Sequence, residues 1–155
     1  MRILGIDPGT GLMGFGIIET GAKPKLVDAG VIRTKVHQAE QERLLIIFDS
    51  LHEIVKETEP QMVSVEKLFF ARNVTTAMSV AQARGVVLLV AQQHGLPIYE
   101  YTPMQIKQSL TGYGKADKKQ MQEMVRLLLN LKEAPKPDDA ADALAAALTH
   151  AAVAG

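Results

Sequence analysis

The acidic side chains that could act together in chemistry lie far apart in this chain. Asp7 closes a short apolar run near the N-terminus, and Glu66 closes a second apolar run much later. The last predicted helix begins with Asp138, Asp139 and Asp142. Asp139 and Asp142 are three positions apart, so a helix presents both on one side. If the two apolar runs are neighbouring parallel strands, the pattern predicts one cluster of carboxylates drawn from three separate elements.

Carboxylates held together repel one another, so such a cluster is stable at neutral pH only if a cation neutralises it or some of the acids stay protonated. Ligands made only of oxygen favour a hard ion such as Mg²⁺ or Mn²⁺. Two such ions about 4 Å apart can activate a water molecule and stabilise the leaving oxygen when a phosphodiester is cleaved. This chemistry needs no cysteine, and the chain contains none. The pattern therefore favours metal-dependent cleavage of a phosphodiester.

Each acid taken singly also has an ordinary structural explanation. An aspartate placed before Pro-Gly, as Asp7 is, is typical of a turn, and Glu66 could be the solvated end of a strand. Asp138 follows a proline at a position typical of a helix N-cap. Asp139 suits the positive end of a helix dipole. Pattern alone leaves these explanations open beside the metal site.

The hydrophobic pattern predicts five strands and five helices that would carry these acids. The predicted strands cover Ile3–Asp7, Gly14–Glu19, Lys25–Thr34, Met62–Val65 and Ile98–Tyr101. The predicted helices cover Glu40–Lys56, Thr75–His94, a stretch that begins at Thr102, Ala116–Leu131, and Asp138 to about Ala152. Neighbouring early strands favour hairpins, and helices between later strands favour parallel crossovers. We therefore expect an α/β fold: a mixed five-stranded sheet with three antiparallel strands, flanked by helices.

Composition limits the class of protein. Of the 155 residues, 47% are hydrophobic and 22% are charged, which suits a single domain over residues 1–155 with its own core. Basic and acidic residues number 17 each, which excludes nucleic-acid binding through bulk positive charge. The N-terminal segment has an acid where a signal peptide needs apolar residues, and no apolar run is as long as a membrane span. We expect a cytoplasmic protein without a membrane segment.

Four stretches of the sequence together resemble a known family. They are ILGIDPGT at the start, VEKLFFARN at 65–73, AQARGV at 81–86 and DAADALAAALTH at 139–150. In this order they resemble the RuvC family of Holliday-junction resolvases, and the likeness runs from Ile3 to about Ala152. The resemblance implies an RNase H-like fold and a homodimer that cuts four-way DNA junctions symmetrically with Mg²⁺. Many relatives continue into a polar, basic tail beyond Gly155, so no DNA contact is assigned to a tail.

The resemblance also implies roles for particular residues. Asp7, Glu66, Asp139 and Asp142 match the family's four metal-binding acids, which would hold two Mg²⁺ ions, with Mn²⁺ as a substitute. The expected products are a 5′-phosphate and a 3′-hydroxyl, which can be ligated directly. Asp138 is an extra acid beside the family's D-A-A-D pattern, whose first acid is Asp139. The family also implies a branch-migration helicase complex as a partner.

Residues just beyond Glu66 could contact DNA. The resemblance implies that an aromatic side chain at Phe69 opens the junction centre, and aromatic faces can stack on unpaired bases. Arg72 and Asn73 could contact phosphate or simply be solvated. Phe69 and Phe70 could equally be core residues.

Basic residues gather between Gln105 and Arg126, where five basic and two acidic side chains give a local balance of +3. The lysines of this stretch are Lys107, Lys115, Lys118 and Lys119. Cationic groups there could hold a phosphate or stabilise developing charge. The resemblance matches Lys107 and Lys118 to lysines used near the scissile phosphate. A solvated helix face is the alternative.

The long helix predicted at 75–94 has small residues at Ala77, Ala81 and Gly85 and is apolar on more than one face. Such a helix can pack on the sheet with one face and on a partner with another. A two-fold dimer through it would place two identical sites side by side, which suits symmetric cutting of two strands. A helix buried within a monomer is the alternative.

Three other functions fit parts of this pattern. The hairpin GIDPGTGLMGFG loosely fits an ATPase of the actin and sugar-kinase type, although such proteins need two domains around the nucleotide. Another RNase H-like nuclease, acting on RNA or other branched DNA, would share Asp7 and Glu66. A catalytically inactive DNA-binding module would not need all four acids.

Overall fold

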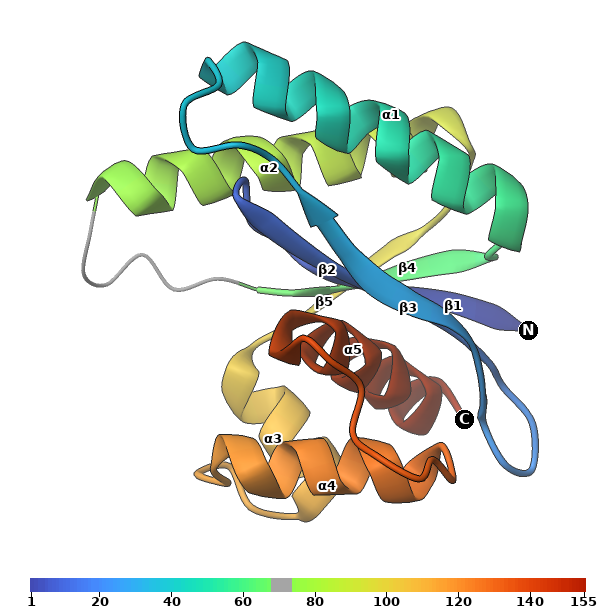
Figure 1. The fold of residues 1–155 in the computed structure, drawn as a ribbon. Helices are drawn as coiled ribbons and strands as arrows, with labels where there is room; N and C mark the ends of the chain where they lie inside the picture. Colours follow the sequence, from blue (N-terminus) through green and yellow to red (C-terminus); the bar gives the residue numbers. More distant parts are fainter. Residues whose placement is uncertain (68–73) are drawn as a thin grey trace.

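The computed structural model describes residues 1–67 and 74–155, and its elements follow the predicted order (Figure 1). The strands are β1 (Arg2–Asp7), β2 (Leu12–Glu19), β3 (Lys25–Arg33), β4 (Met62–Glu66) and β5 (Ile98–Tyr101). The helices are α1 (Glu40–Thr58), α2 (Val74–Gln93), α3 (Pro103–Thr111), α4 (Lys118–Leu128) and α5 (Asp138–Ala154). Each predicted strand is confirmed, with small shifts at its ends. None of the helices in the described part of the chain combines the length and apolar character needed to cross a bilayer.

The strands form one mixed sheet in the order β3-β2-β1-β4-β5. β1 pairs antiparallel with β2, and β2 pairs antiparallel with β3. β4 lies parallel to β1 on its other side, and β5 lies parallel to β4. The register pairs Ile6 of β1 with Val65 of β4. The next residue of each strand is an acid, so Asp7 and Glu66 lie on neighbouring strands at the same end of the sheet.

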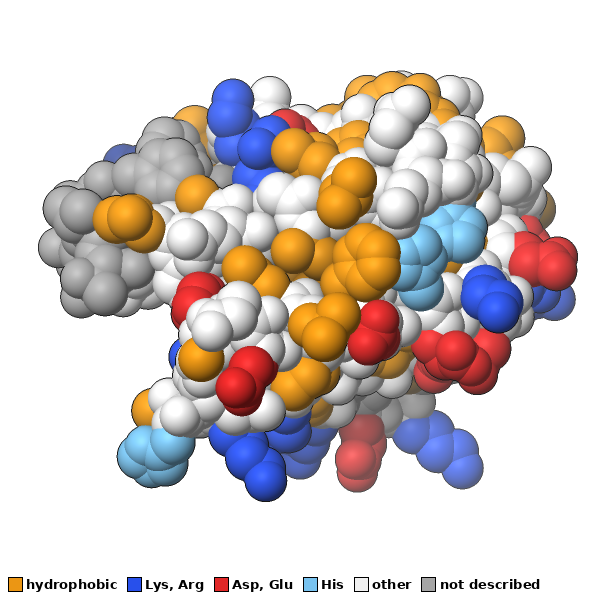
Figure 2. All heavy atoms as spheres, turned by 90° about the horizontal axis from the view of Figure 1, so that it is seen from above, with side chains coloured by type: hydrophobic (Ala, Val, Ile, Leu, Met, Phe, Trp, Pro, Cys, Tyr) orange, Lys and Arg blue, Asp and Glu red, His pale blue; other side chains and the backbone are white. Residues whose placement is uncertain are grey.

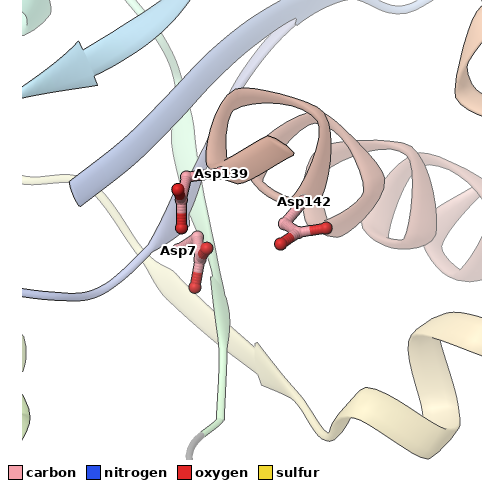
Figure 3. Close-up of side chains that lie close together, drawn as sticks. All are labelled: Asp7, Asp139 and Asp142. Carbon is pink, nitrogen blue, oxygen red and sulfur yellow. The ribbon is translucent and has the colours of Figure 1, made fainter. Parts of the chain in front are cut away.

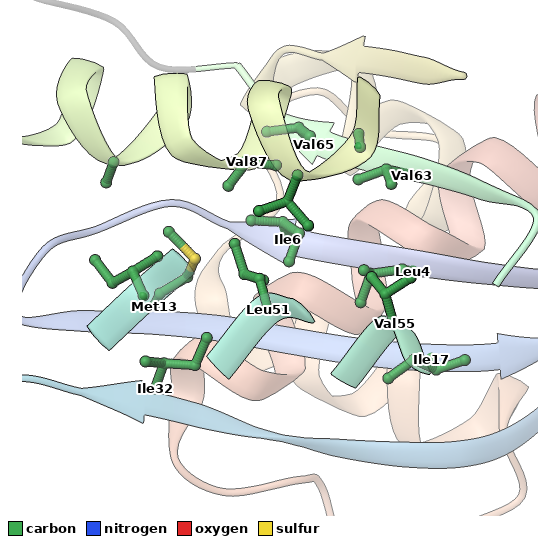
Figure 4. Packing of buried hydrophobic residues seen from close by; sticks show 14 residues of the cluster. Leu4, Ile6, Met13, Ile17, Ile32, Leu51, Val55, Val63, Val65 and Val87 are labelled. Carbon is green, nitrogen blue, oxygen red and sulfur yellow. The ribbon is translucent and has the colours of Figure 1, made fainter. Parts of the chain in front are cut away.

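Helices cover both faces of the sheet: α1 and α2 lie on one face, and α3, α4 and α5 lie on the other (Figure 1). The hydrophobic core between the sheet and the first pair includes Leu4, Ile6, Met13, Ile17, Leu51, Val63, Val65 and Val87 (Figure 4). The core on the other face includes Ile3, Ile18, Ile106, Val125, Leu144 and Leu148. The sheet therefore separates two cores.

Strand periodicity places the two strand acids on the face that α5 covers. Successive side chains of a strand point to opposite faces. In β1, Leu4 and Ile6 belong to the core under α1 and α2, whereas Ile3 belongs to the core under α5. Asp7 shares the parity of Ile3. In β4, Glu66 shares the parity of Ser64, whose Oγ donates a 2.7 Å hydrogen bond to a backbone oxygen of α5.

The helix predicted over Ala116–Leu131 is shorter than expected, because local capping sets both of its ends. Asp117 caps the start: its side chain accepts from the backbone N–H of Gln120, and the Gln120 side chain accepts from the backbone N–H of Asp117. Just beyond the end, Asn130 adopts a left-handed conformation with φ of 53°. α4 is therefore confined to the residues between these two features.

α5 lies very close to β1 and β2, because both strands present glycine beneath it. A Cβ added to Gly5 would lie 1.9 Å from the backbone oxygen of Ala143, and one added to Gly14 would lie 2.0 Å from that of Asp139. A Cβ added to Gly16 would lie 2.5 Å from the side chain of Leu144. We call Gly5, Gly14 and Gly16 the glycine contact surface. It sets the height at which the first turns of α5 rest on the sheet.

Replacing Gly14 by alanine is expected to lower the free energy of unfolding by about 1–3 kcal/mol, because the new methyl group must push α5 away from β2. Urea denaturation would measure the loss. Gly21→Ala is the matched control, since a Cβ there comes no closer than 4.0 Å to another residue's atom. Equal stability of the two variants would contradict the close contact.

Candidate active site

Three carboxylates from two distant parts of the chain meet at the end of the central strand. Asp7, Asp139 and Asp142 each offer an oxygen, and these oxygens all lie within 4.8 Å of one another. Figure 3 shows the three side chains facing one another, Asp7 from the end of β1 and the other two from the start of α5. The predicted i,i+3 placement of Asp139 and Asp142 on one side of a helix is confirmed. The three oxygens are close enough together to share one cation.

Glu66 stands beside this group. It lies next to Asp7 across the β1–β4 pair and hydrogen-bonds with the Asp7 side chain, which lowers the pKa of Glu66. Burial and the charge of Asp142 act more strongly in the other direction, so the pKa of Glu66 is raised overall. Its carboxyl group therefore belongs to the same electrostatic unit as the three aspartates.

If all of these acids were ionised, the basic groups of the protein would not fully balance their negative charge, and the pKa values show this. Burial, followed by the charges of Glu66 and Asp142, raises the pKa of Asp7 from 3.8 to about 9. Burial also raises the pKa of Asp142, although the charge of Lys118 opposes the rise. At neutral pH these carboxyl groups can all ionise only if a cation joins them. An all-carboxylate donor set with raised pKa values fits a hard divalent ion.

Asp138 is not one of the three acids that meet. Pro137 occupies the N-cap position of α5 and Asp138 is the first helical residue, so the interpretation of Asp138 as the N-cap is wrong. Its Oδ1 accepts a 2.9 Å hydrogen bond from Gln122 of α4. The carboxylate that joins Asp7 from this part of the chain is therefore that of Asp139.

Lys118 at the start of α4 is the cation nearest to the acids among the ion pairs of the described residues. Its Nζ lies 3.4 Å from Oδ2 of Asp142 and 3.8 Å from Oδ2 of Asp138. The ammonium group partly balances Asp142 and remains more than half exposed. It can therefore also meet a ligand that approaches from solvent.

A cavity of about 220 Å³ opens beside the acids. It is lined by Glu66, Pro103, Ile106, Lys107, Lys118, Met121, Asp142 and Ala145. Two acids and two predicted phosphate-binding lysines thus share one hollow between β4, α3, α4 and α5. Pro103, Ile106 and Met121 were not predicted as part of the site. Pro103 lies one helical turn before Lys107, and Ile106 lies next to it, which is the only signal that could have indicated these two residues.

The other predicted lysines are not brought to this hollow. Lys119 lines a separate cavity of about 560 Å³ between α3 and α4, together with Tyr113 and Met124. Lys115 is exposed in the loop between these helices. Phe69, Phe70, Arg72 and Asn73 lie outside the described residues, so their roles stay predictions.

The sheet order, together with acids on two neighbouring parallel strands and on a helix packed over them, defines an RNase H-like nuclease. Two solved structures share this fold over nearly the whole chain. "Thermus thermophilus RuvC structure" is 42% identical with a TM-score of 0.92, and the match covers 99% of this chain and 95% of that one. "T. thermophilus RuvC in complex with Holliday junction substrate" is 43% identical with a TM-score of 0.95, covering 99% and 94%.

Comparison of the sequence with known families and proteins leads to the same family as the structural matches. The family model described as "Crossover junction endodeoxyribonuclease RuvC" matches residues 3–150. A protein of that name from Desulfitobacterium hafniense is 59% identical over 152 residues, which are 97% of this chain and 92% of that protein. The chain belongs to the RuvC family of crossover junction endodeoxyribonucleases. Membership in this family supports the hypothesis of a nuclease. It gives no support to the alternative hypothesis of an ATPase of the actin and sugar-kinase type.

Proposed function

We propose that this protein resolves four-way (Holliday) DNA junctions by nicking two strands symmetrically, leaving 5′-phosphate and 3′-hydroxyl ends. The observation that carries the proposal is the meeting of three carboxyl oxygens within 4.8 Å beside a cavity lined by lysines. The relatives' name and the junction-bound structure support the substrate. In this proposal residues 1–155 act as one nuclease domain.

Asp7, Glu66, Asp139 and Asp142 would hold two divalent ions, Mg²⁺ or, as a substitute, Mn²⁺. Such ions, when bound, supply activation of water and stabilisation of the leaving oxygen in phosphodiester cleavage. The contribution of the chain is to hold the ligand oxygens in place. The sheet fixes Asp7 and Glu66, whereas the contact of α5 with the glycine contact surface fixes Asp139 and Asp142.

The DNA backbone would approach from the lysine side of the cavity. In this proposal Lys107 and Lys118, which line the cavity together with Glu66 and Asp142, contact the phosphate nearest the acids. Lys115 and Lys119, being exposed on the same region of the surface, would contact more distant phosphates. For Phe69, Arg72 and Asn73 the proposal rests on the family resemblance alone.

The outer face of α2 supports a homodimer. Met78 is 61% and Leu89 is 51% exposed there, and Ala81 and Gly85 lie between them. Figure 2 shows hydrophobic side chains gathered over α1 and α2. A two-fold axis through this face would bring two acid sites to one junction. A branch-migration helicase complex remains the proposed partner, and the cytoplasm, where bacterial DNA lies, the proposed location.

Lys118→Gln is expected to lower the rate of junction cleavage about a hundredfold, because an ammonium group beside the reacting phosphate is lost. Single-turnover cleavage at saturating protein would measure it. Lys119→Gln is the matched control: it removes the same charge from the neighbouring residue, which lines the other cavity. If both variants lose activity equally, only the general positive charge of α4 matters.

The decisive test is a synthetic four-way junction incubated with the protein, with and without Mg²⁺, and scored for paired nicks that a ligase can seal. Linear duplex DNA and an RNA of equal length serve as competitors. Paired, ligatable, Mg²⁺-dependent nicks are expected on the junction alone. Preferred cutting of RNA or of other branched DNA would replace the proposal by the alternative RNase H-like activity.

A further inference from the structure

The loop that follows Asp7 is held in place by residues from three other elements. It covers residues 8–11 and joins β1 to β2. Beyond the end of β3, the backbone N–H of Thr34 donates to the backbone oxygen of Gly11 over 3.1 Å, and the Thr34 hydroxyl donates to the backbone oxygen of Thr10. From α1, Nε of Arg43 donates to the same Thr34 hydroxyl over 2.8 Å. The backbone of the loop is therefore tied to the neighbouring strand and helix.

The side chain of Thr10 points into the protein and extends these ties to α2. Thr10 is only 7% exposed, and its hydroxyl is hydrogen-bonded to the hydroxyl of Ser79. The Ser79 hydroxyl in turn donates to Oε1 of Glu40, over 3.2 Å. Three polar side chains thus form one chain from the loop, through α2, to the first residue of α1.

The direction of this chain follows from the acid at its end. An ionised carboxylate can only accept, so the single proton of Ser79 goes to Glu40. The Thr10 hydroxyl must then be the donor to Ser79. Both hydroxyl groups point their protons toward the same negative charge, and successive bonds of this kind strengthen one another.

This anchoring bears on Asp7, because the loop begins at the residue directly after it. One oxygen of Asp7 lies within 4.8 Å of oxygens of Asp139 and Asp142, and β1 ends at Asp7. Beyond that point no strand pairing of β1 restrains the backbone. Pro8 is buried but its side chain cannot hydrogen-bond, so Thr10 is the first buried side chain after Asp7 that hydrogen-bonds to another element.

We propose that Thr10 is a positioning residue for Asp7: its hydrogen-bonded chain to Ser79 and Glu40 keeps the Asp7 carboxylate where it can share a divalent cation with Asp139 and Asp142. This inference rests on the proposed metal-dependent function. Thr10 itself contacts neither the cation nor DNA.

The test compares Thr10→Val, which keeps the shape and removes the hydroxyl, with Thr10→Ser, which keeps the hydroxyl. Mn²⁺ affinity would be measured without DNA, from the paramagnetic resonance signal of free Mn²⁺. We expect Thr10→Val to weaken Mn²⁺ binding about fivefold, the scale of one net hydrogen bond, and Thr10→Ser to bind as wild type does. The Mg²⁺ concentration for half-maximal cleavage should rise by the same factor, with little change in the rate at saturating Mg²⁺.

Thr58→Val is the matched control for a purely structural effect. Thr58 is 6% exposed, its hydroxyl donates to the backbone oxygen of Ile54 over 2.7 Å, and it lies at the far end of α1. It should lose stability while keeping Mn²⁺ affinity. Should Thr10→Val fail to fold, Ser79→Ala breaks the same chain from α2 and is expected to give the same fivefold weakening.

Wild-type Mn²⁺ affinity in a folded Thr10→Val or Ser79→Ala variant would overturn the inference, as would an equal loss in Thr58→Val. Either result would leave the proposed function standing, since the wild type would still bind Mn²⁺ and cut junctions. A wild-type protein that binds no Mn²⁺ and cuts no junction would instead refute the proposed function and the inference together.

Discussion

Asp7→Asn is expected to lower the rate of junction cleavage by about a thousandfold or more, while the protein still folds and still binds junctions. The substitution removes one of the meeting carboxylates without changing the size of the side chain. The cation ligands act on the charge of the transition state, where the loss of a single stabilising group is costly. Single-turnover cleavage and a gel-shift assay of junction binding would separate the two effects.

The control for this prediction is Asp49→Asn, which removes the same charge from an exposed residue of α1, on the opposite face of the sheet from α5 (Figure 1). Its cleavage rate should stay within about threefold of the wild-type rate, the scale of a surface charge. An Asp7→Asn variant that cuts at nearly normal speed would remove the basis for the metal site.

In the absence of divalent metal, the free energy of unfolding is expected to fall as the pH rises from about 6 to 9, by about 1 kcal/mol for each pH unit. The pKa of Asp7 is 3.8 in the unfolded reference and about 9 in the folded protein. Between these values the unfolded chain is ionised while the folded chain retains the proton, so a rise in pH favours unfolding. Glu66 and Asp142 have raised pKa values and act in the same direction.

Urea denaturation in EDTA at several pH values would measure this slope. The slope should be shallower in Asp7→Asn, whose amide does not titrate, and that variant should be the more stable one at pH 8. Added Mg²⁺ should also reduce the slope of the wild type, because metal affinity increases as the ligands ionise. A metal-free wild type whose stability does not change over this range would contradict the raised pKa of Asp7.

Much of this architecture is predictable because it rests on local pattern. The five strands, their order along the chain and the mixed sheet follow from alternation and turn residues, and the structure confirms them. The meeting of Asp139 with Asp142 follows from helical periodicity. Their meeting with Asp7 follows from the preference for chemistry at strand ends in open sheets.

Other features of the structure cannot be predicted from the sequence, because each of them depends on contacts between distant segments of the chain. The need for glycine at Gly5 arises from Ala143, which is far away in the chain. Lys118 and Lys119 are adjacent and alike, yet they line different cavities, because the packing of α4 decides which side of that helix meets the acids. The hydrogen bond between Thr10 and Ser79 likewise becomes visible only when α2 lies against the loop.

The glycine contact surface lets α5 approach β1 and β2 closely. A Cβ at Gly5 or Gly14 would collide with the main chain of α5, so a larger residue at either position would shift the helix. Mg²⁺ holds its ligands at roughly 2.0–2.1 Å, whereas Ca²⁺ holds them at roughly 2.3–2.6 Å. If Asp7, Asp139 and Asp142 share an ion as proposed, the spacing of their carboxylates depends on how closely the main chain of α5 approaches β1 and β2. A side chain added to either strand at these positions would change that spacing, and with it the size of the ion that fits.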